Sequence, residues 1–504
     1  MTKGDSIRKS YLSTLLINMI SKPLGLLSSA LIAYYFGTGQ EIDSFLWVAY
    51  FVMLFYGVII GNWGSAIVPV ITEIKNKDGI EKEKEFIGFI FTWATIVILT
   101  TAILLYFGAG LFVDSFTNFD ENRTKLATEM LQIMSIYYVF TSLYNISEVI
   151  LNSYREFKTP YFLKVIFSPL VVIGSVYYYA QEYGINSLIA GNILSFFLIF
   201  ISVIYFFIKR RVFSAGVILV FDASYLKSFF RILLPLYFTQ ILNNAVEIFS
   251  KYLLTGFQVG AIAFISYAER LINMVNAAFA DNLSKIYFTE YGHVLHDEGK
   301  AELTKLYEKN LYLVWMIVIP ISSMLFFFGD YILGILLKRG SFTEESLVNT
   351  FIALKMLSIG IFAWSGHLFT GKLFATLKDT IIGMYFVIPN SIITISMYYY
   401  LAKQMGFLGV ALSSSLSAIY SFSFLLIVFY FRHYKLPIVK IFTILLIMLI
   451  FWFGFSYGLV HYFQYDSLFS IYELLKYFSI IFSIYIVTFG ILFKIAKNKK
   501  WIEI

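Results

Sequence analysis

Polar and charged side chains recur at helical spacing in two apolar segments near the middle of the chain. The first set, here called the first polar stripe, is Gln240, Asn243, Asn244, Glu247 and Lys251. The second polar stripe is Arg270, Asn273, Asp281, Ser284 and Lys285. Steps of three and four residues place side chains on one face of a helix. Because a charge at membrane depth costs about 3 kcal/mol, we expect each face to line a cavity that holds water, protein or a polar substrate.

The composition indicates the kind of protein that contains such a cavity. Hydrophobic residues make up 59% of the 504 residues and charged residues 14%, which is typical of an integral membrane protein. The sequence contains no cysteine, which excludes disulfides, thiolate metal sites and a cysteine nucleophile. The first apolar stretch has no small-residue cleavage site, so we expect it to be retained as a helix.

Apolar segments of spanning length predict an all-α integral membrane protein with about fourteen transmembrane helices. The predicted segments are residues 11–36, 43–73, 86–112, 126–152, 160–180, 185–208, 226–254, 258–289, 304–333, 346–375, 380–401, 407–431, 438–461 and 470–494. Lysine and arginine concentrate in alternate connections between them. The connections of the other set contain only Arg123, Lys125, Lys338, Arg339 and Lys403. Under the positive-inside rule, this asymmetry predicts that both termini lie in the cytoplasm.

An internal repeat has a period of roughly 220 residues. The segment Tyr183–Ala190 resembles Met405–Leu412, and each opens a helix that ends in aromatic and basic residues. We therefore expect two six-helix lobes, 1–215 and 216–435, related by a pseudo-two-fold axis along the membrane normal, followed by two additional helices in 436–504. Two lobes around a polar cleft are typical of an alternating-access transporter.

Several short motifs resemble those of the MurJ/MviN lipid II flippases. Residues 21–37 are similar to the family's first-helix signature, S-R-x-L-G-x-x-R-D-x-x-x-A-x-x-F-G. The remaining matches, in chain order, are Asp43-Ser44-Phe45, Val68-Pro69, Tyr267-Ala268-Glu269-Arg270-Leu271 and Arg339-Gly340-Ser341-Phe342-Thr343. The resemblance covers nearly the whole chain, including the two additional helices.

The resemblance implies a fourteen-helix flippase of the bacterial cytoplasmic membrane, in which the first, second, seventh and eighth helices line a cationic cavity. It implies that Lys22 takes the place of a cavity arginine, that Arg270 and Asp43 keep the family's residues, and that Glu269 keeps its charge. It also implies that the last two helices form a groove for the lipid tail. Ser28 and Ser29 stand where the family has an Arg-Asp pair, which favours a relative that moves another polyprenyl-linked saccharide.

The chemistry of the two polar stripes suits a substrate with a pyrophosphate, sugars and a polyprenyl tail. The charged headgroup cannot cross hydrocarbon, whereas the tail can stay in lipid. We expect cations for the phosphates from Lys22, Lys251, Arg270 and Lys285. We expect contacts to the sugars from Asn18, Asn243, Asn244, Asn273, Trp47 and Tyr50.

We therefore expect a monomeric flippase that moves an undecaprenyl-pyrophosphate-linked saccharide, lipid II or a related cell-envelope precursor, from the inner to the outer leaflet. We expect no enzymatic activity, cofactor, metal site or nucleic-acid partner, and membrane lipids as further partners. A coupling cation near Glu148 is one interpretation, and an interhelical hydrogen bond is the alternative.

Several of these residues also allow a purely structural interpretation. Glu247 and Lys251 are four residues apart and suit a structural ion pair as well as a substrate contact. Lys285 could snorkel to the interface, and Asp43 could be only a helix cap. For the whole chain, the sequence also leaves open a cation-coupled drug exporter, an O-antigen or exopolysaccharide repeat-unit flippase, and a membrane glycosyltransferase or ligase.

Overall fold

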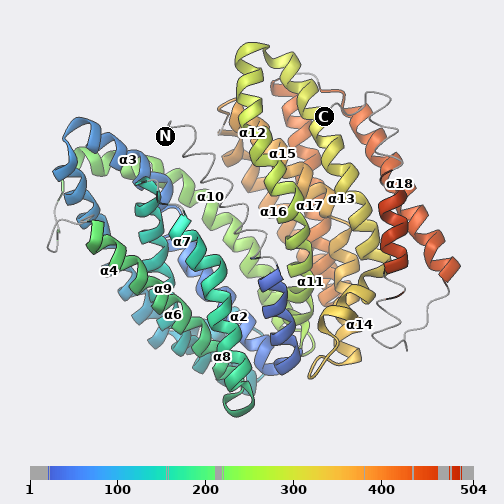
Figure 1. Ribbon diagram of the computed structural model, residues 1–504, viewed down its shortest axis with the longest axis horizontal. Helices are drawn as coiled ribbons and strands as arrows, with labels where there is room; N and C mark the ends of the chain where they lie inside the picture. The colour runs from blue at the N-terminus through green and yellow to red at the C-terminus, as the bar shows by residue number, and fades with distance from the viewer. Residues whose placement is uncertain are drawn as a thin grey trace. The chain divides into compact units, whose positions relative to one another are not determined.

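The computed structural model describes residues 21, 23–154, 156, 158–210, 218, 221–379, 381–433, 436–463, 476, 479–488 and 490 (Figure 1). The described residues form helices and contain no strand, so the predicted all-α class is confirmed. The chain divides into two compact units, Met1–Ile262 and Ala263–Ile504.

The helices have the lengths and apolar character that a membrane requires. Among the described residues, eight helices could cross a membrane, or nine if one bent pair of helices forms a single span. Each predicted apolar segment coincides with described helix, in whole or in part. The first and last predicted segments lie partly outside the described residues, so the predicted number of helices remains a prediction.

Unit 1 begins with a helix over Pro23–Phe36. Its further helices are α2 (Gln40–Ile59), α3 (Trp63–Lys77), α4 (Ile80–Phe107), α5 (Ala109–Phe116), α6 (Glu121–Ser153), α7 (Lys158–Phe162), the π-helix η1 (Leu163–Phe167), α8 (Ser168–Tyr183), α9 (Ile185–Arg210) and α10 (Ala223–Thr255). Local chemistry sets some of these boundaries. Asp120 caps α6, because its side chain accepts a hydrogen bond from the Arg123 backbone N–H at 3.0 Å.

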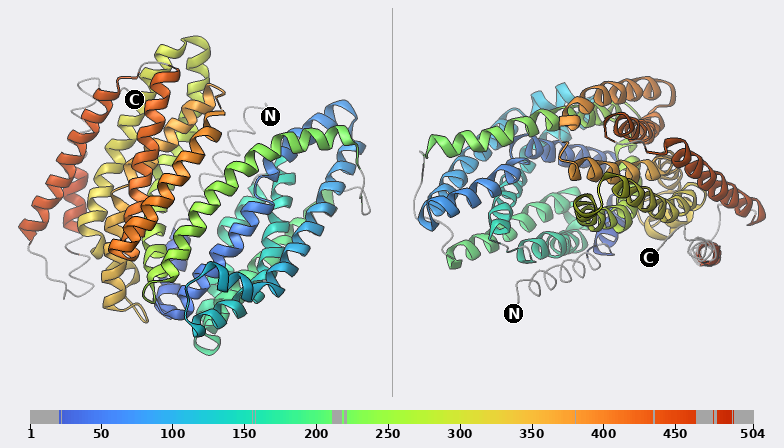
Figure 2. Two further views of the ribbon diagram at one scale, coloured as in Figure 1. Left: turned by 180° about the vertical axis from the view of Figure 1, so that it is seen from behind. Right: turned by 90° about the horizontal axis from the view of Figure 1, so that it is seen from above.

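Helix α6 is the centre of unit 1 and packs against α2, α4 and α9. Helix α10 also belongs to this unit, although the predicted sequence repeat assigns it to the second lobe. It packs on α2 and α3, and Figure 2 shows it in green beside the blue α2. The division by contacts therefore falls after α10, and the lobe boundary predicted from the repeat, between residues 215 and 216, stays a prediction.

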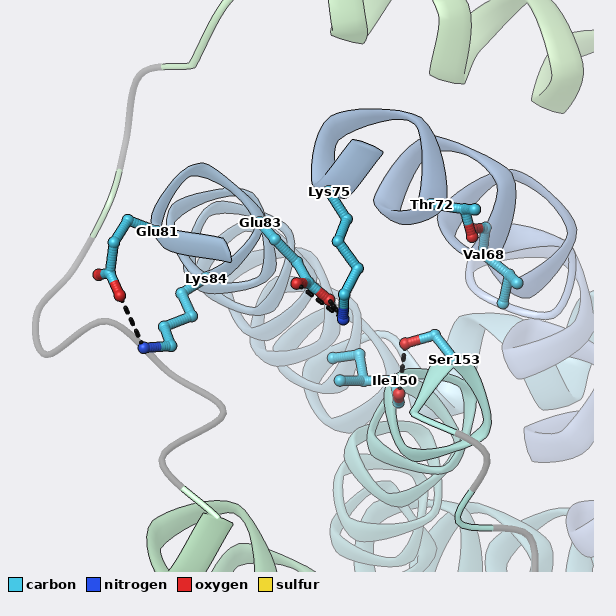
Figure 3. A network of polar contacts seen from close by, with 8 residues as sticks. All are labelled: Val68, Thr72, Lys75, Glu81, Glu83, Lys84, Ile150 and Ser153. Carbon is cyan, nitrogen blue, oxygen red and sulfur yellow. Dashed lines mark hydrogen bonds and ion pairs between the residues drawn. The ribbon is translucent and has the colours of Figure 1, made fainter. Parts of the chain in front are cut away.

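An ion pair joins α3 to α4 near the C-terminal end of α6 (Figure 3). Glu83 on α4 is only 1% exposed, and its carboxylate lies 3.2 Å from the Lys75 ammonium on α3. The same ammonium lies 5.1 Å from the ring centroid of Tyr154, which follows α6. A buried carboxylate needs such a partner, so Lys75 stabilises the α3–α4 turn against α6.

Unit 2 consists of α11 (Ala261–Val275), the π-helix η2 (Asn276–Ala280), α12 (Asp281–Asp297), α13 (Lys300–Leu337), α14 (Glu344–Ser358), α15 (Ile361–Thr376), α16 (Ile381–Met405), α17 (Phe407–Arg432), α18 (Ile438–Phe463) and a last helix, Ser479–Thr488. Gly406 separates α16 from α17 with φ 63°, as Gly184 separates α8 from α9 with φ 52°. Glycine adopts positive φ without a steric penalty, so the two similar sequence segments make the same kind of turn.

The additional C-terminal helices are attached to α13. The Lys440 ammonium at the start of α18 pairs with Glu308. Near the middle of these helices, the Tyr485 hydroxyl hydrogen-bonds Ser323 at 3.3 Å, and its ring stacks on Trp452 with centroids 5.5 Å apart. Phe326 packs on Phe453 at 5.5 Å. Because these contacts recur along α13, the C-terminal helices form one body with unit 2.

Candidate functional site

Three of the predicted site residues meet where α2 faces α10 in unit 1. The Tyr50 hydroxyl donates a hydrogen bond to the Glu247 carboxylate at 2.6 Å. The Lys251 ammonium lies 5.5 Å from the centroid of the Tyr50 ring. Glu247 is exposed and Tyr50 is half-buried, so this cluster can reach a ligand. A carboxylate, a hydroxyl and an ammonium side by side can bind sugar hydroxyls and a phosphate.

The amides of the first polar stripe lie farther along the same helix pair. Gln240 Nε2 donates to Asn244 Oδ1 at 2.8 Å. A Cβ atom at Gly57 would lie 3.6 Å from Gln240 Nε2 and 3.7 Å from Asn244 Nδ2. Because glycine leaves that space open, α2 approaches the two amides closely. Asn243, by contrast, is exposed, whereas Asn244 is buried.

Two predicted residues of α2 lie inside the packing of unit 1. Trp47 is 2% exposed, and its ring stacks on Phe51 with centroids 4.8 Å apart. Asp43 is also buried, in the first turn of α2. The N-cap position of this helix is Gly39, so Asp43 does not occupy that position. Both side chains are buried, whereas Tyr50 on the same helix is half-buried.

In unit 2, two of the sequence motifs are in contact. Tyr267 of the segment that holds Glu269 and Arg270 packs edge-on against Phe342 of the Arg339–Thr343 motif, with ring centroids 5.6 Å apart. The Arg270 guanidinium lies 5.8 Å from the Tyr267 ring centroid. Tyr267 is buried and Arg270 half-buried. The buried tyrosine therefore supports the arginine from one side, which favours a fixed orientation of the guanidinium.

The second polar stripe does not lie on one regular α-helix, although its spacing predicts one. The π-helix η2 separates Arg270 from Asp281, and a π-turn uses an extra residue. Residues after η2 are therefore rotated from their predicted positions relative to Arg270. Asn273 and Lys285 are exposed, Asp281 is half-buried and Ser284 is buried. The expectation that the second polar stripe shares one face of a regular helix is therefore wrong, and snorkelling of Lys285 stays a prediction.

Lys22 and Asn18 lie outside the described residues. The remaining candidate, Glu148 on α6, has a partner that the sequence does not reveal. Its carboxylate lies 3.1 Å from the Lys164 ammonium on η1, which also donates to Asn145 Oδ1 at 3.1 Å. The interhelical hydrogen bond is thus present. Lys164 follows a polar turn and belongs to another helix than Glu148. Helical spacing therefore does not relate the two residues, and the sequence does not predict the pair.

Comparison with known proteins gives a consistent result. The family model for lipid II flippase MurJ matches residues 32–477. A probable lipid II flippase MurJ of Buchnera aphidicola subsp. Baizongia pistaciae is 28% identical over 71% of this chain and 70% of its own length. The corresponding protein of Borreliella burgdorferi is 25% identical over 87% of each chain.

Solved structures with the same fold include a lipid II flippase MurJ in an inward closed conformation. It has a TM-score of 0.80 and 22% identity, over 96% of this chain and 99% of that chain. An inward-facing multidrug resistance MATE family transporter has a TM-score of 0.70 and 14% identity, over 86% of this chain and 99% of that chain. The family model covers most of the chain, and this chain therefore belongs to the lipid II flippase MurJ family.

Proposed function

We propose that this protein flips lipid II, an undecaprenyl-pyrophosphate-linked saccharide, from the inner to the outer leaflet of the bacterial cytoplasmic membrane. The observation that carries the proposal is the exposed polar cluster of Tyr50, Glu247 and Lys251 on helices of spanning length. Lipid cannot accommodate such a cluster, and a headgroup that must cross the membrane needs one.

The proposed roles follow from the chemistry of each side chain. Arg270, Lys22, Lys251 and Lys285 bind the pyrophosphate, and Arg270 does so with two parallel hydrogen bonds. Tyr50, Glu247 and the amides of α10 bind the saccharide, because neutral hydroxyl groups need both donors and acceptors. The apolar outer face of α18 contacts the lipid tail.

Transport by alternating access is the mechanism that we propose for one chain acting as a monomer. An inside-negative potential favours outward movement of an anionic headgroup by about 2.3 kcal/mol per charge at 100 mV. A coupled cation would then help the empty carrier to return. The likeness to the MATE transporter lies at 14% identity and concerns the fold, so it does not favour drug export.

The test is complementation. A bacterium whose own lipid II flippase is depleted expresses the full chain, and lipid II on the outer leaflet is measured with an externally added enzyme that cleaves it. We expect growth and outer-leaflet lipid II to return. If the chain is inserted in the membrane and lipid II nevertheless stays inside, the proposal is wrong. Rescue of a strain that lacks a different polyprenyl-linked saccharide flippase, and not of this one, would support that different substrate.

A further inference from the structure

The Lys164 ammonium in unit 1 is held by three groups of α6. Glu148 Oε2 and Asn145 Oδ1 each lie 3.1 Å from Lys164 Nζ, and the Tyr144 ring centroid lies 5.7 Å from it. The Tyr144 hydroxyl donates to the Pro160 carbonyl at 2.7 Å, which fixes the ring. Two oxygens and an aromatic face are groups that bind cations.

The Glu148 side chain is less exposed than the Lys164 side chain that pairs with it. The Lys164 side chain is 39% exposed and that of Glu148 is 18% exposed. Lysine has four side-chain torsions, so its ammonium can leave without movement of the backbone. Lys164 also lies on the π-helix η1, and π-turns within helices are frequent at functional sites.

The cluster lies within a candidate membrane span, because Thr159–Tyr183 includes Lys164. Lys164 lies six positions after Lys158, the start of α7, which is about 9 Å at ~1.5 Å per residue. A carboxylate at such a position is unfavourable without a counter-charge. If the ammonium leaves, Glu148 therefore needs another cation.

We propose that Glu148, Asn145 and Tyr144 form a site for a monovalent cation, that the Lys164 ammonium occupies it as a tethered cation, and that a free cation replaces it when Lys164 turns away. The site exchanges one positive charge for another and stays neutral. The site has one carboxylate and one amide oxygen, so a single positive charge suits it better than a multivalent metal.

The experiment uses the purified full-length protein and its thermal unfolding in sodium, potassium or choline chloride at equal concentration. Choline is too large for the space that an ammonium fills. Lys164→Met removes the charge and keeps the length of the side chain. For each protein, we compare the Tm in sodium or potassium chloride with the Tm in choline chloride. We expect this difference in Tm to be larger for Lys164→Met than for the unchanged protein by about 2 °C or more. The rise should saturate with salt concentration.

Two variants make the result specific. Lys164→Met combined with Glu148→Gln should lose the additional response, because the carboxylate is the principal ligand. Lys125→Met, at an exposed position on α6, should respond as the unchanged protein does. If Lys164→Met unfolds on extraction, we expect extraction in sodium or potassium chloride, and not in choline chloride, to recover it.

An equal response of Lys164→Met and the unchanged protein would overturn the proposal, as would an undiminished response of the double variant. Equal recovery of Lys164→Met in all three salts would identify a structural ion pair and would also overturn it. The samples for these measurements contain no lipid-linked saccharide. A negative result for the cation site is therefore distinct from a failure of the proposed flippase activity.

Discussion

Arg270 is the residue whose replacement tests the proposed phosphate site most directly. Arg270→Ala should abolish rescue of flippase-depleted cells while the protein still inserts. Arg270→Lys should fail nearly as badly, because a point charge cannot form two parallel hydrogen bonds, each of which contributes about 1.5–3 kcal/mol when a charge is involved. The measurement is outer-leaflet lipid II. Arg231→Ala, at an exposed position on α10, is the matched control and should rescue.

The competing explanation is that Arg270 only neutralises a nearby acid. Rescue of Arg270→Ala by Glu269→Gln or Asp281→Asn would then be expected, because the double change removes the uncompensated charge. Such a rescue would count against a phosphate site. A double variant as inactive as the single variant would support the phosphate site.

Asp379, in the connection between α15 and α16, pairs with two basic residues at the C-terminal end of α17. The Asp379 side chain is 8% exposed, and it accepts hydrogen bonds from Arg432 Nε at 2.7 Å and from His433 Nε2 at 2.7 Å. Burial opposes the charged form of Asp379, but the hydrogen bonds from Arg432 and His433 outweigh it and hold the pKa of the carboxyl below its usual range.

A lowered pKa in the folded state means that the pair stabilises the protein above the unfolded-state pKa of about 3.9. That stabilisation is lost as the pH falls through the folded-state pKa. We expect Asp379→Asn to unfold at a lower temperature than the unchanged protein at neutral pH, and the difference to shrink below about pH 4. A difference that is constant from neutral to acidic pH would show that the charge of Asp379 is not the cause.

At the scale of elements, α16 and α17 pack so closely that one position requires glycine. A Cβ atom at Gly409 would lie 2.0 Å from the Leu401 carbonyl oxygen. Gly409→Ala must therefore push the two helices apart, at a cost of about 1–3 kcal/mol. Gly371 on α15 is the matched control, because a Cβ there would meet nothing within 4 Å. Thermal unfolding should show a clearly lower Tm for Gly409→Ala and no lower Tm for Gly371→Ala. Equal changes in Tm would contradict this account.

The sequence predicts the elements better than their local geometry. Hydropathy locates the helices because a bilayer imposes one length and one composition on each span. It cannot locate η1 and η2, because a π-turn leaves the composition unchanged and alters only the hydrogen bonding. Helical spacing therefore places Arg270 and Lys285 on one face, and it gives no sign that Glu148 pairs with Lys164.

The site is predictable where both partners belong to regular helices. Tyr50, Glu247 and Lys251 do come together, because α2 and α10 are continuous over these residues. For Trp47, the expected contact with the sugars rests on residue type alone. The structure surrounds it with Phe51 and Phe119, and only the tertiary packing reveals that.

At the scale of the whole molecule, the testable property is orientation. The chain has no cysteine, so single-cysteine variants can be made without first removing native ones. Asn122→Cys should react with an impermeant reagent added outside the cell, and His296→Cys only after the cytoplasm is opened. Both positions are exposed. Labelling of Asn122→Cys only from the cytoplasm would reverse the predicted topology.

The attachment of α18 to α13 bears on the entropy of the transport cycle. A polyprenyl chain in the bilayer samples many conformations, and ordering it along a helix costs free energy for each bond that is fixed. Glu308, Ser323 and Phe326 anchor the C-terminal helices to unit 2 from one end of α13 to its middle, so a lipid tail bound on α18, as we propose, would stay with unit 2. The tail would then lose conformational freedom once, when the lipid arrives, and regain it once, when the lipid departs.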